Sequence, residues 1–248
     1  MLDDYRAQLR ARGVCVIPGF VPDDEIAAMV EECDALAAGA YHQDVQGTPY
    51  LELPSDDWPA DHPRATWTRS AVHTLGYDQF PAASRIRRLY EDDAFLSFLS
   101  DVLERRPLYR YADPIGALNV AVMTEGDVLG WHYDQTDFVV SLAIQSSERG
   151  GDFENVAHLR RADGDEDYAT VAAILRGDGR DRVVVEPMTP GTLMIFEGRR
   201  SLHRVTPIEG DRPRYVALFG YDTKPDTMSS DLLKQIRYGR TEPLRATG

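Results

Sequence analysis

Apolar residues recur at two different spacings along this chain, and the spacing changes near residue 108. Before that point they repeat every three or four residues, which is typical of amphipathic helices. After it, short runs rich in β-branched and aromatic residues alternate with turns rich in glycine, proline and aspartate, which is typical of strands. The pattern predicts a helical N-terminal part followed by a β-rich core.

Helices are predicted at residues 2–12, at about 23–38 and at 83–105, with a strand at 13–20 that ends at a proline and a glycine. Residues 40–82 have no clear period and contain several prolines, so they are predicted to form a long ordered loop. Loops of this length inside compact domains usually carry binding residues or cover a site.

The later part of the chain predicts an antiparallel sandwich or barrel, because several short strands follow one another closely. These strands are expected at 117–124, 130–133, 138–145, 151–156, 183–186, 192–196 and 214–221, and a surface insertion with a helix at 168–175 interrupts them. We predict one domain, 1–248, with a helical and loop N-terminal part (1–107), a β core (about 108–222) and a C-terminal lid or helix (223–248).

Charge and cysteine content narrow the classes of partner. The chain has 41 acidic and 27 basic residues and a formal charge of −14, which opposes binding to nucleic acid and to anionic membranes. Neither a targeting signal nor a long apolar run is recognisable, so a cytoplasmic protein with a small-molecule substrate is expected. Cys15 and Cys33 lie in no metal-binding or redox motif and are predicted to be buried free thiols.

Three residues are candidate metal ligands. His132 and Asp134 stand two apart in a predicted strand, where alternate side chains project to the same face, so both can bind one ion. His203 follows the strand predicted at 192–196. Two imidazoles and one carboxylate form the facial triad of non-haem iron(II) oxygenases, which leaves positions open for other ligands. A His-x-Asp pair alone is more often an ordinary hydrogen-bonded pair. Further motifs in the sequence are therefore needed to identify a metal site.

Arg214 adds a second signal, because it opens an apolar strand shortly after His203. A guanidinium buried in such a strand requires an anion, and arginine can bind a carboxylate through two parallel hydrogen bonds. Arg212 is the alternative, but it lies beside Pro213 in a predicted turn. We therefore favour Arg214 as the anion-binding residue.

Together these motifs resemble the jelly-roll, cupin-type iron(II)/2-oxoglutarate-dependent oxygenases. The matching segments are 13–20, 132–134, 150–154, 190–196, 203–205 and Arg214. The resemblance implies a mainly β double-stranded β-helix with flanking helices. It also implies iron(II) bound by His132, Asp134 and His203, with 2-oxoglutarate as a cosubstrate whose distal carboxylate Arg214 binds, and with O₂ as oxidant.

Segments 199–207, 212–214 and 238–241 more loosely resemble a group acting on free amino acids, which contains radical halogenases and hydroxylases. Its halogenating members carry a small residue in place of the carboxylate ligand, so that chloride can bind there. Asp134 departs from that pattern. Hydroxylation is therefore expected rather than halogenation.

Further residues are candidates for binding small molecules. Asn119 is predicted to hydrogen-bond the cosubstrate, or equally to close a pair of strands. Candidates for substrate contact, each of which has a purely structural alternative, are Arg69 and His73 in the predicted loop, Gln135, Asp137 and Tyr238. His42, His62 and His158 are given no role.

The leading hypothesis is an oxygenase that hydroxylates an unactivated C–H bond of a small polar metabolite, with a free amino acid as the candidate substrate. No catalytic residue is predicted beyond the metal ligands. The same centre can instead support desaturation, cyclisation or epoxidation. An alternative from another class is a cupin-like protein that binds a metal without catalysis.

Overall fold

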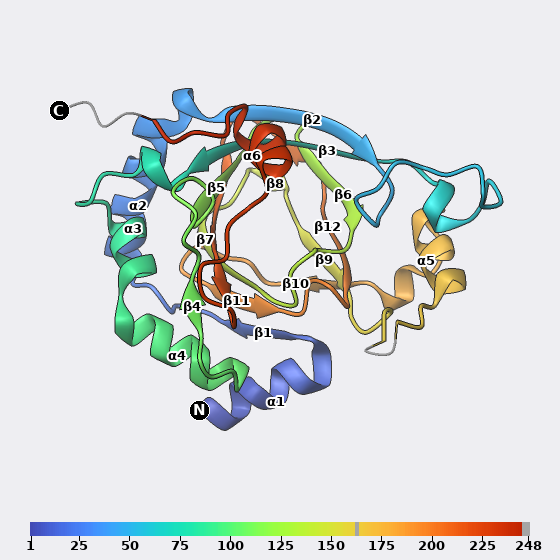
Figure 1. Ribbon diagram of the computed structural model, residues 1–248, viewed down its shortest axis with the longest axis horizontal. Coiled ribbons are helices and arrows are strands. Elements are labelled where there is room, and N and C mark those ends of the chain that lie inside the picture. The colour runs from blue at the N-terminus through green and yellow to red at the C-terminus, as the bar shows by residue number, and fades with distance from the viewer. Residues whose placement is uncertain (162–163, 245–248) are drawn as a thin grey trace.

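A large antiparallel sheet curls into a nearly closed barrel at the centre of the molecule (Figure 1). The computed structural model describes residues 1–161 and 164–244, so the end of the predicted C-terminal segment, 245–248, lies outside the described residues. Helices flank the barrel, which confirms the predicted jelly roll. In Figure 1, α2, α3 and α4 lie to the left of the barrel, α1 lies below it and α5 lies to the right.

The helices are α1 (Leu2–Arg12), α2 (Asp23–Leu36), α3 (Arg85–Glu91), α4 (Asp93–Leu103), α5 (Tyr168–Leu175) and α6 (Asp231–Tyr238). The prediction of a single helix at 83–105 is wrong, because two helices, α3 and α4, meet at Asp92. This residue has an extended backbone, and its carboxylate accepts a hydrogen bond from Ala94 N at 2.8 Å. It is therefore the N-cap of α4 and ends α3.

The strands are β1 (Val14–Ile17), β2 (Tyr41–Gly47), β3 (Thr68–Gly76), β4 (Tyr109–Arg110), β5 (Leu118–Met123), β6 (Val128–His132), β7 (Val139–Gln145), β8 (Arg149–Gly150), β9 (Phe153–Val156), β10 (Val184–Glu186), β11 (Leu193–Phe196), β12 (Leu202–Val205), β13 (Ile208–Glu209), β14 (Arg214–Phe219) and β15 (Tyr221–Asp222). The main sheet has the order β1-β11-β7-β14-β5-β3-β6-β12-β9-β10, and β2 pairs with β3. Every strand segment predicted from the sequence overlaps an observed strand, although β6 begins two residues before the segment predicted at 130–133.

The long loop predicted at 40–82 is wrong at both of its ends. β2 and β3 lie within it, and β2 pairs with β3 along its whole length, from Tyr41 opposite Thr74 to Gly47 opposite Thr68. β3 also pairs with β5 and β6, so it joins the two halves of the barrel. Because residues 71–75 are largely buried on both faces, β3 lacks the polar and apolar alternation that marks a half-exposed strand.

Alternate residues of β5 separate two apolar clusters. Val120 and Val122 belong to the large outer cluster that packs against the N-terminal helices, whereas Ala121 and Met123 belong to a cluster with Phe153 and Phe196 inside the barrel. A polar side chain on the inner face is therefore surrounded by apolar groups. Such a side chain needs a bonding partner, because burial without one is costly.

Cys15 and Cys33 are buried free thiols, as predicted. Burial raises the pKa of Cys15 to about 11 and that of Cys33 to about 12, so neither is a reactive thiolate near neutral pH. Within the described residues, no helix has the length and apolar character needed to span a bilayer.

Candidate metal centre

The fold brings the three predicted metal ligands together at the end of the barrel interior. β6 ends at His132, which lies directly opposite His203 of β12. Asp134 follows β6, with Oδ1 3.9 Å from Nε2 of His132 and Oδ2 3.3 Å from Nε2 of His203. The ligand atoms all lie within 4.8 Å of one another, so a single ion can contact all three residues.

Backbone carbonyl groups fix the orientation of both imidazole rings. Nδ1 of His132 lies 2.7 Å from the carbonyl oxygen of Gly130, and Nδ1 of His203 lies 2.9 Å from that of Ser201. A carbonyl oxygen only accepts, so each Nδ1 carries a hydrogen, and Nε2 is the ring atom directed at Asp134 as the potential metal ligand. Burial, followed by the neighbouring His203, lowers the pKa of His132 to about 4, which keeps that ring neutral at neutral pH.

The carboxylate of Asp134 is held beside a turn between β11 and β12. Its backbone N–H donates to the carbonyl oxygen of Gly198 at 3.0 Å. A Cβ atom on Gly198 would stand 2.0 Å from Oδ2 of Asp134, so only glycine leaves room for the carboxylate in this position. β6 ends at His132, one residue before the end of the predicted strand, so strand alternation does not extend to Asp134 and contact with Gly198 places this ligand instead.

The donor set fits a divalent cation. Oδ2 of Asp134 is buried and has no hydrogen-bond donor within the described part of the chain. It lies 3.3 Å from Nε2 of His203, so a cation bound to both atoms would satisfy this buried carboxylate oxygen. Two imidazoles and one carboxylate match the non-haem iron(II) facial triad.

Arg214 lies on the inner face of the barrel, opposite Met123. It is only 6% exposed, and no carboxylate of the described residues lies within 4.0 Å of its guanidinium; Nη1 instead contacts Sδ of Met123 at 3.9 Å. Burial lowers the pKa of Arg214 to about 10, so it remains charged near neutral pH. Gly151 leaves space for it, since a Cβ there would stand 2.8 Å from Cδ of Arg214. Such a cation requires an anionic ligand.

The fold also places Arg212, the alternative anion-binding residue, and Asn119, the second candidate for cosubstrate binding. Arg212 is exposed and donates to the carbonyl oxygens of Ser146 and Ser147 at 2.9 and 3.1 Å, so its guanidinium is already engaged. Asn119 is buried and alternates along β5 with the residues of the outer cluster, which directs it to the same inner face as Met123.

The predicted substrate-contacting residues do not form one group. Arg69 and His73 lie on β3 rather than in a loop, where Arg69 pairs with Asp44 at 2.9 Å and His73 pairs with Asp127. Tyr238 is buried in α6, and burial raises its pKa to about 12.

Gln135 and Asp137 lie in the loop directly after the metal ligands and line a pocket of about 210 Å³. Asp137 forms an ion pair with Arg199 at 2.7 Å, and Arg199 also donates to the carbonyl oxygen of Gln135. Charged side chains of both signs line this pocket, namely Arg105, Asp137, Arg199, Asp222 and Lys224.

Sequence reasoning missed two residues near the metal centre. Nothing in the sequence marks Gly198 as a site residue, because its role depends on the contact between its turn and Asp134. Arg237, in α6, is close enough for its charge to contribute to the lowered pKa of His132, after burial and His203. Its position far along the chain gives no signal of this proximity. α6 therefore extends towards the metal centre.

Gly198→Ala is expected to weaken Fe(II) binding at least about tenfold, because the added methyl group must displace the Asp134 carboxylate. Gly39→Ala is the matched control, since its Cβ would meet only the end of the Gln79 side chain at 3.2 Å. Titration of both purified variants with Fe(II) under anaerobic conditions measures the effect. Equal affinity in the two variants would contradict the role assigned to Gly198.

The barrel and its ligand set define a jelly-roll protein with a candidate non-haem metal centre, and comparison with solved structures supports the fold. A 2OG-Fe(II) oxygenase family oxidoreductase from Burkholderia pseudomallei aligns with a TM-score of 0.56 and 17% identity, over 90% of this chain and 92% of that one. The chain shares its fold with these oxygenases.

Two further similar structures were solved with ligands. The epimerase SnoN, in complex with Fe3+, alpha ketoglutarate and nogalamycin RO, aligns with a TM-score of 0.59 and 18% identity over 98% of this chain and 93% of that one. HygX from Streptomyces hygroscopicus, with nickel, 2-oxoglutarate and hygromycin B bound, aligns with a TM-score of 0.53 and 17% identity, over 88% of this chain and 86% of that one.

The family model described as Halogenase D matches residues 58–236. The chain belongs to this family. The matched range contains the three candidate ligands and Arg214. No curated protein matches the sequence.

Proposed function

We propose that this protein is an iron(II)- and 2-oxoglutarate-dependent oxygenase that hydroxylates a C–H bond of a small polar metabolite. The observation that carries the proposal is the combination of the His132–Asp134–His203 ligand set with the unpaired Arg214 inside one barrel. The first supplies a metal site with open positions, and the second supplies a cation for a dicarboxylate cosubstrate.

The residues of the barrel interior bind and orient the metal and the cosubstrate. When bound, iron with 2-oxoglutarate supplies the activation of O₂ for attack on a C–H bond. His132, Asp134 and His203 hold the metal, and Arg214 binds the distal carboxylate of the cosubstrate. The rings of Phe153 and Phe196 pack against His203, with centroids 5.6 and 5.0 Å away, and exclude water from that side of the centre. The ligand-bound forms of SnoN and HygX support this cofactor set.

Asp134 favours hydroxylation over halogenation. Its carboxylate lies between the two imidazoles and against Gly198, where it fills the position that a chloride ion would need. Halogenation is nevertheless the second candidate, because the matching family is described as a halogenase. The two reactions differ in the atom delivered to the substrate, and the product distinguishes them.

The pocket lined by Gln135 and Asp137 favours a substrate that carries both charges. Its lining includes Arg105, Lys224 and Asp222 close to the loop that follows Asp134. A zwitterionic metabolite such as a free amino acid offers an ammonium and a carboxylate group to such a lining. Arg237 adds a further cation near the centre.

Turnover with labelled oxygen tests the proposal. The protein is incubated with Fe(II), ascorbate, 2-oxoglutarate, ¹⁸O₂ and a panel of free amino acids, with chloride present or absent. We expect succinate in step with a product that has gained one labelled oxygen atom. A chlorinated product would establish halogenation instead, and a product that has lost hydrogen would indicate desaturation or cyclisation. Iron binding without succinate formation across the panel would favour metal binding without catalysis.

A further inference from the structure

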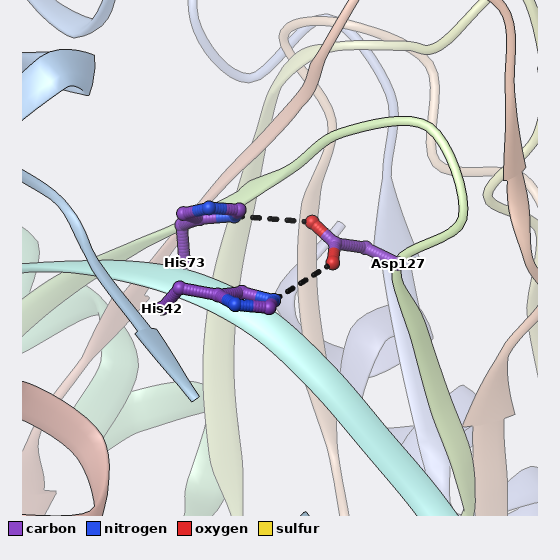
Figure 2. Close-up of side chains that lie close together, drawn as sticks. All are labelled: His42, His73 and Asp127. Carbon is purple, nitrogen blue, oxygen red and sulfur yellow. Dashed lines mark hydrogen bonds and ion pairs between the residues drawn. The ribbon is translucent and has the colours of Figure 1, made fainter. Parts of the chain in front are cut away.

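A second group of metal-ligating side chains lies outside the barrel interior. His42 of β2 and His73 of β3 are direct cross-strand partners, and their rings stack with centroids 4.1 Å apart. Asp127, in the turn before β6, faces both rings: Oδ1 is 3.3 Å from Nε2 of His42, and Oδ2 is 3.2 Å from Nδ1 of His73 (Figure 2). Three chain segments thus place two imidazoles and one carboxylate together.

This cluster is separate from the candidate iron site. His73 lies opposite Val122, which belongs to the outer apolar cluster, so it projects from the outer face of the sheet. His132 and His203 project to the inside. The family model begins at residue 58, so His42 lies before the matched range.

The carboxylate of Asp127 is held in place before any ion binds. Its Oδ2 accepts hydrogen bonds from the backbone N–H and the hydroxyl of Thr124 at 2.8 and 3.1 Å. The side chain of Asp127 is only 6% exposed, whereas those of His42 and His73 are 42% and 30% exposed. An oriented buried carboxylate with two accessible imidazoles gives an ion both a defined ligand and a route from solvent.

The spacing fits tetrahedral coordination. One ligand atom from each of the three residues lies within 4.8 Å of the other two, so small side-chain movements bring them to the separation of about 3.3 Å that zinc–ligand bonds of about 2.0–2.1 Å require. Arg69 is the nearby cation, and its ion pair with Asp44 offsets its charge. The local charge of these groups remains negative, which favours a divalent cation.

We propose that His42, His73 and Asp127 form a second metal site, which binds a zinc-type divalent cation with three protein ligands and a water molecule. The ion joins the β2–β3 hairpin to the turn that leads into β6, the strand that ends at His132. Its expected role is to stabilise this edge of the barrel. It takes no part in oxygen chemistry, because the site lies on the opposite face of the sheet.

Zinc titration in a protein that lacks the iron ligands isolates the second site. In the His132→Ala/His203→Ala background, monitored by competition with a chromophoric chelator, we expect one bound Zn²⁺ and a rise in melting temperature. Adding His42→Ala or Asp127→Asn is expected to weaken that binding at least about tenfold. Asp127→Asn retains an oxygen acceptor for Thr124, so it preserves the turn while removing the carboxylate charge.

His62→Ala is the matched control, because His62 stacks on Trp58 away from the cluster. It should leave the zinc stoichiometry and affinity unchanged. Zinc binding that is equal in the background protein and in the Asp127→Asn and His42→Ala variants would overturn the proposal. So would the absence of bound zinc in the background protein while circular dichroism shows it to be folded.

Discussion

Asp134→Ala is expected to reduce the turnover of 2-oxoglutarate at least about 100-fold, because it removes the only anionic ligand of the candidate triad. Imidazole ligands carry no negative charge, so the site loses the charge that offsets a divalent cation. Fe(II) affinity should fall together with succinate formation. In the presence of chloride, the vacated position beside Gly198 can accept the halide, and product analysis by mass spectrometry shows whether chlorine is transferred.

The matched control for this substitution is Asp137→Ala, which removes a carboxylate from the same loop. Asp137 pairs with Arg199 and does not approach the two histidines as Asp134 does. Its Fe(II) affinity should equal that of the wild type. Retention of wild-type iron affinity and succinate formation in Asp134→Ala would remove this residue from the metal site.

Arg214→Met is expected to weaken 2-oxoglutarate binding about 30-fold or more, because loss of one partner of a buried charge pair costs at least about 2 kcal/mol. The same change should stabilise the ligand-free protein by about 1 kcal/mol or more, since it replaces a buried, unpaired cation with an apolar chain of similar length. Equilibrium denaturation and cosubstrate titration measure the two effects. Their opposite signs separate a binding role from a structural one.

Arg212→Met provides the control for Arg214. The Arg212 guanidinium bonds two backbone carbonyl groups, so its loss should lower the free energy of unfolding and leave 2-oxoglutarate affinity close to that of the wild type. If Arg212→Met rather than Arg214→Met lost the cosubstrate, the assignment would be reversed.

Much of the fold was predictable because its strands and helices carry local signals. The helix at Tyr168–Leu175 and the strand at Leu193–Phe196 coincide with apolar runs bounded by turn residues. β2 and β3 were missed because their stability comes from pairing. β2 is mostly exposed, and β3 is largely buried on both faces over residues 71–75, so neither shows the alternation that marks a strand.

The candidate iron site was predictable because its residue types are distinctive and close in sequence. His132 and Asp134 stand two positions apart, and Arg214 begins an otherwise apolar strand, so sequence could nominate each of them. The candidate substrate contacts were less predictable. Arg69 and His73 could not be placed without knowing that they lie on β3, where Asp44 and Asp127 bind them.

The sequence by itself determined the jelly-roll class and a set of metal-ligand and anion-binding candidates, because period, turn residues and short motifs are local properties. Only the tertiary structure decided how these candidates meet. The register of β6 against β12 brings His132 opposite His203, and the turn at Gly198 leaves room for Asp134. The register of β2 against β3 likewise brings together His42 and His73, which no sequence spacing connects. Contacts between distant segments depend on strand pairing, which local sequence does not encode.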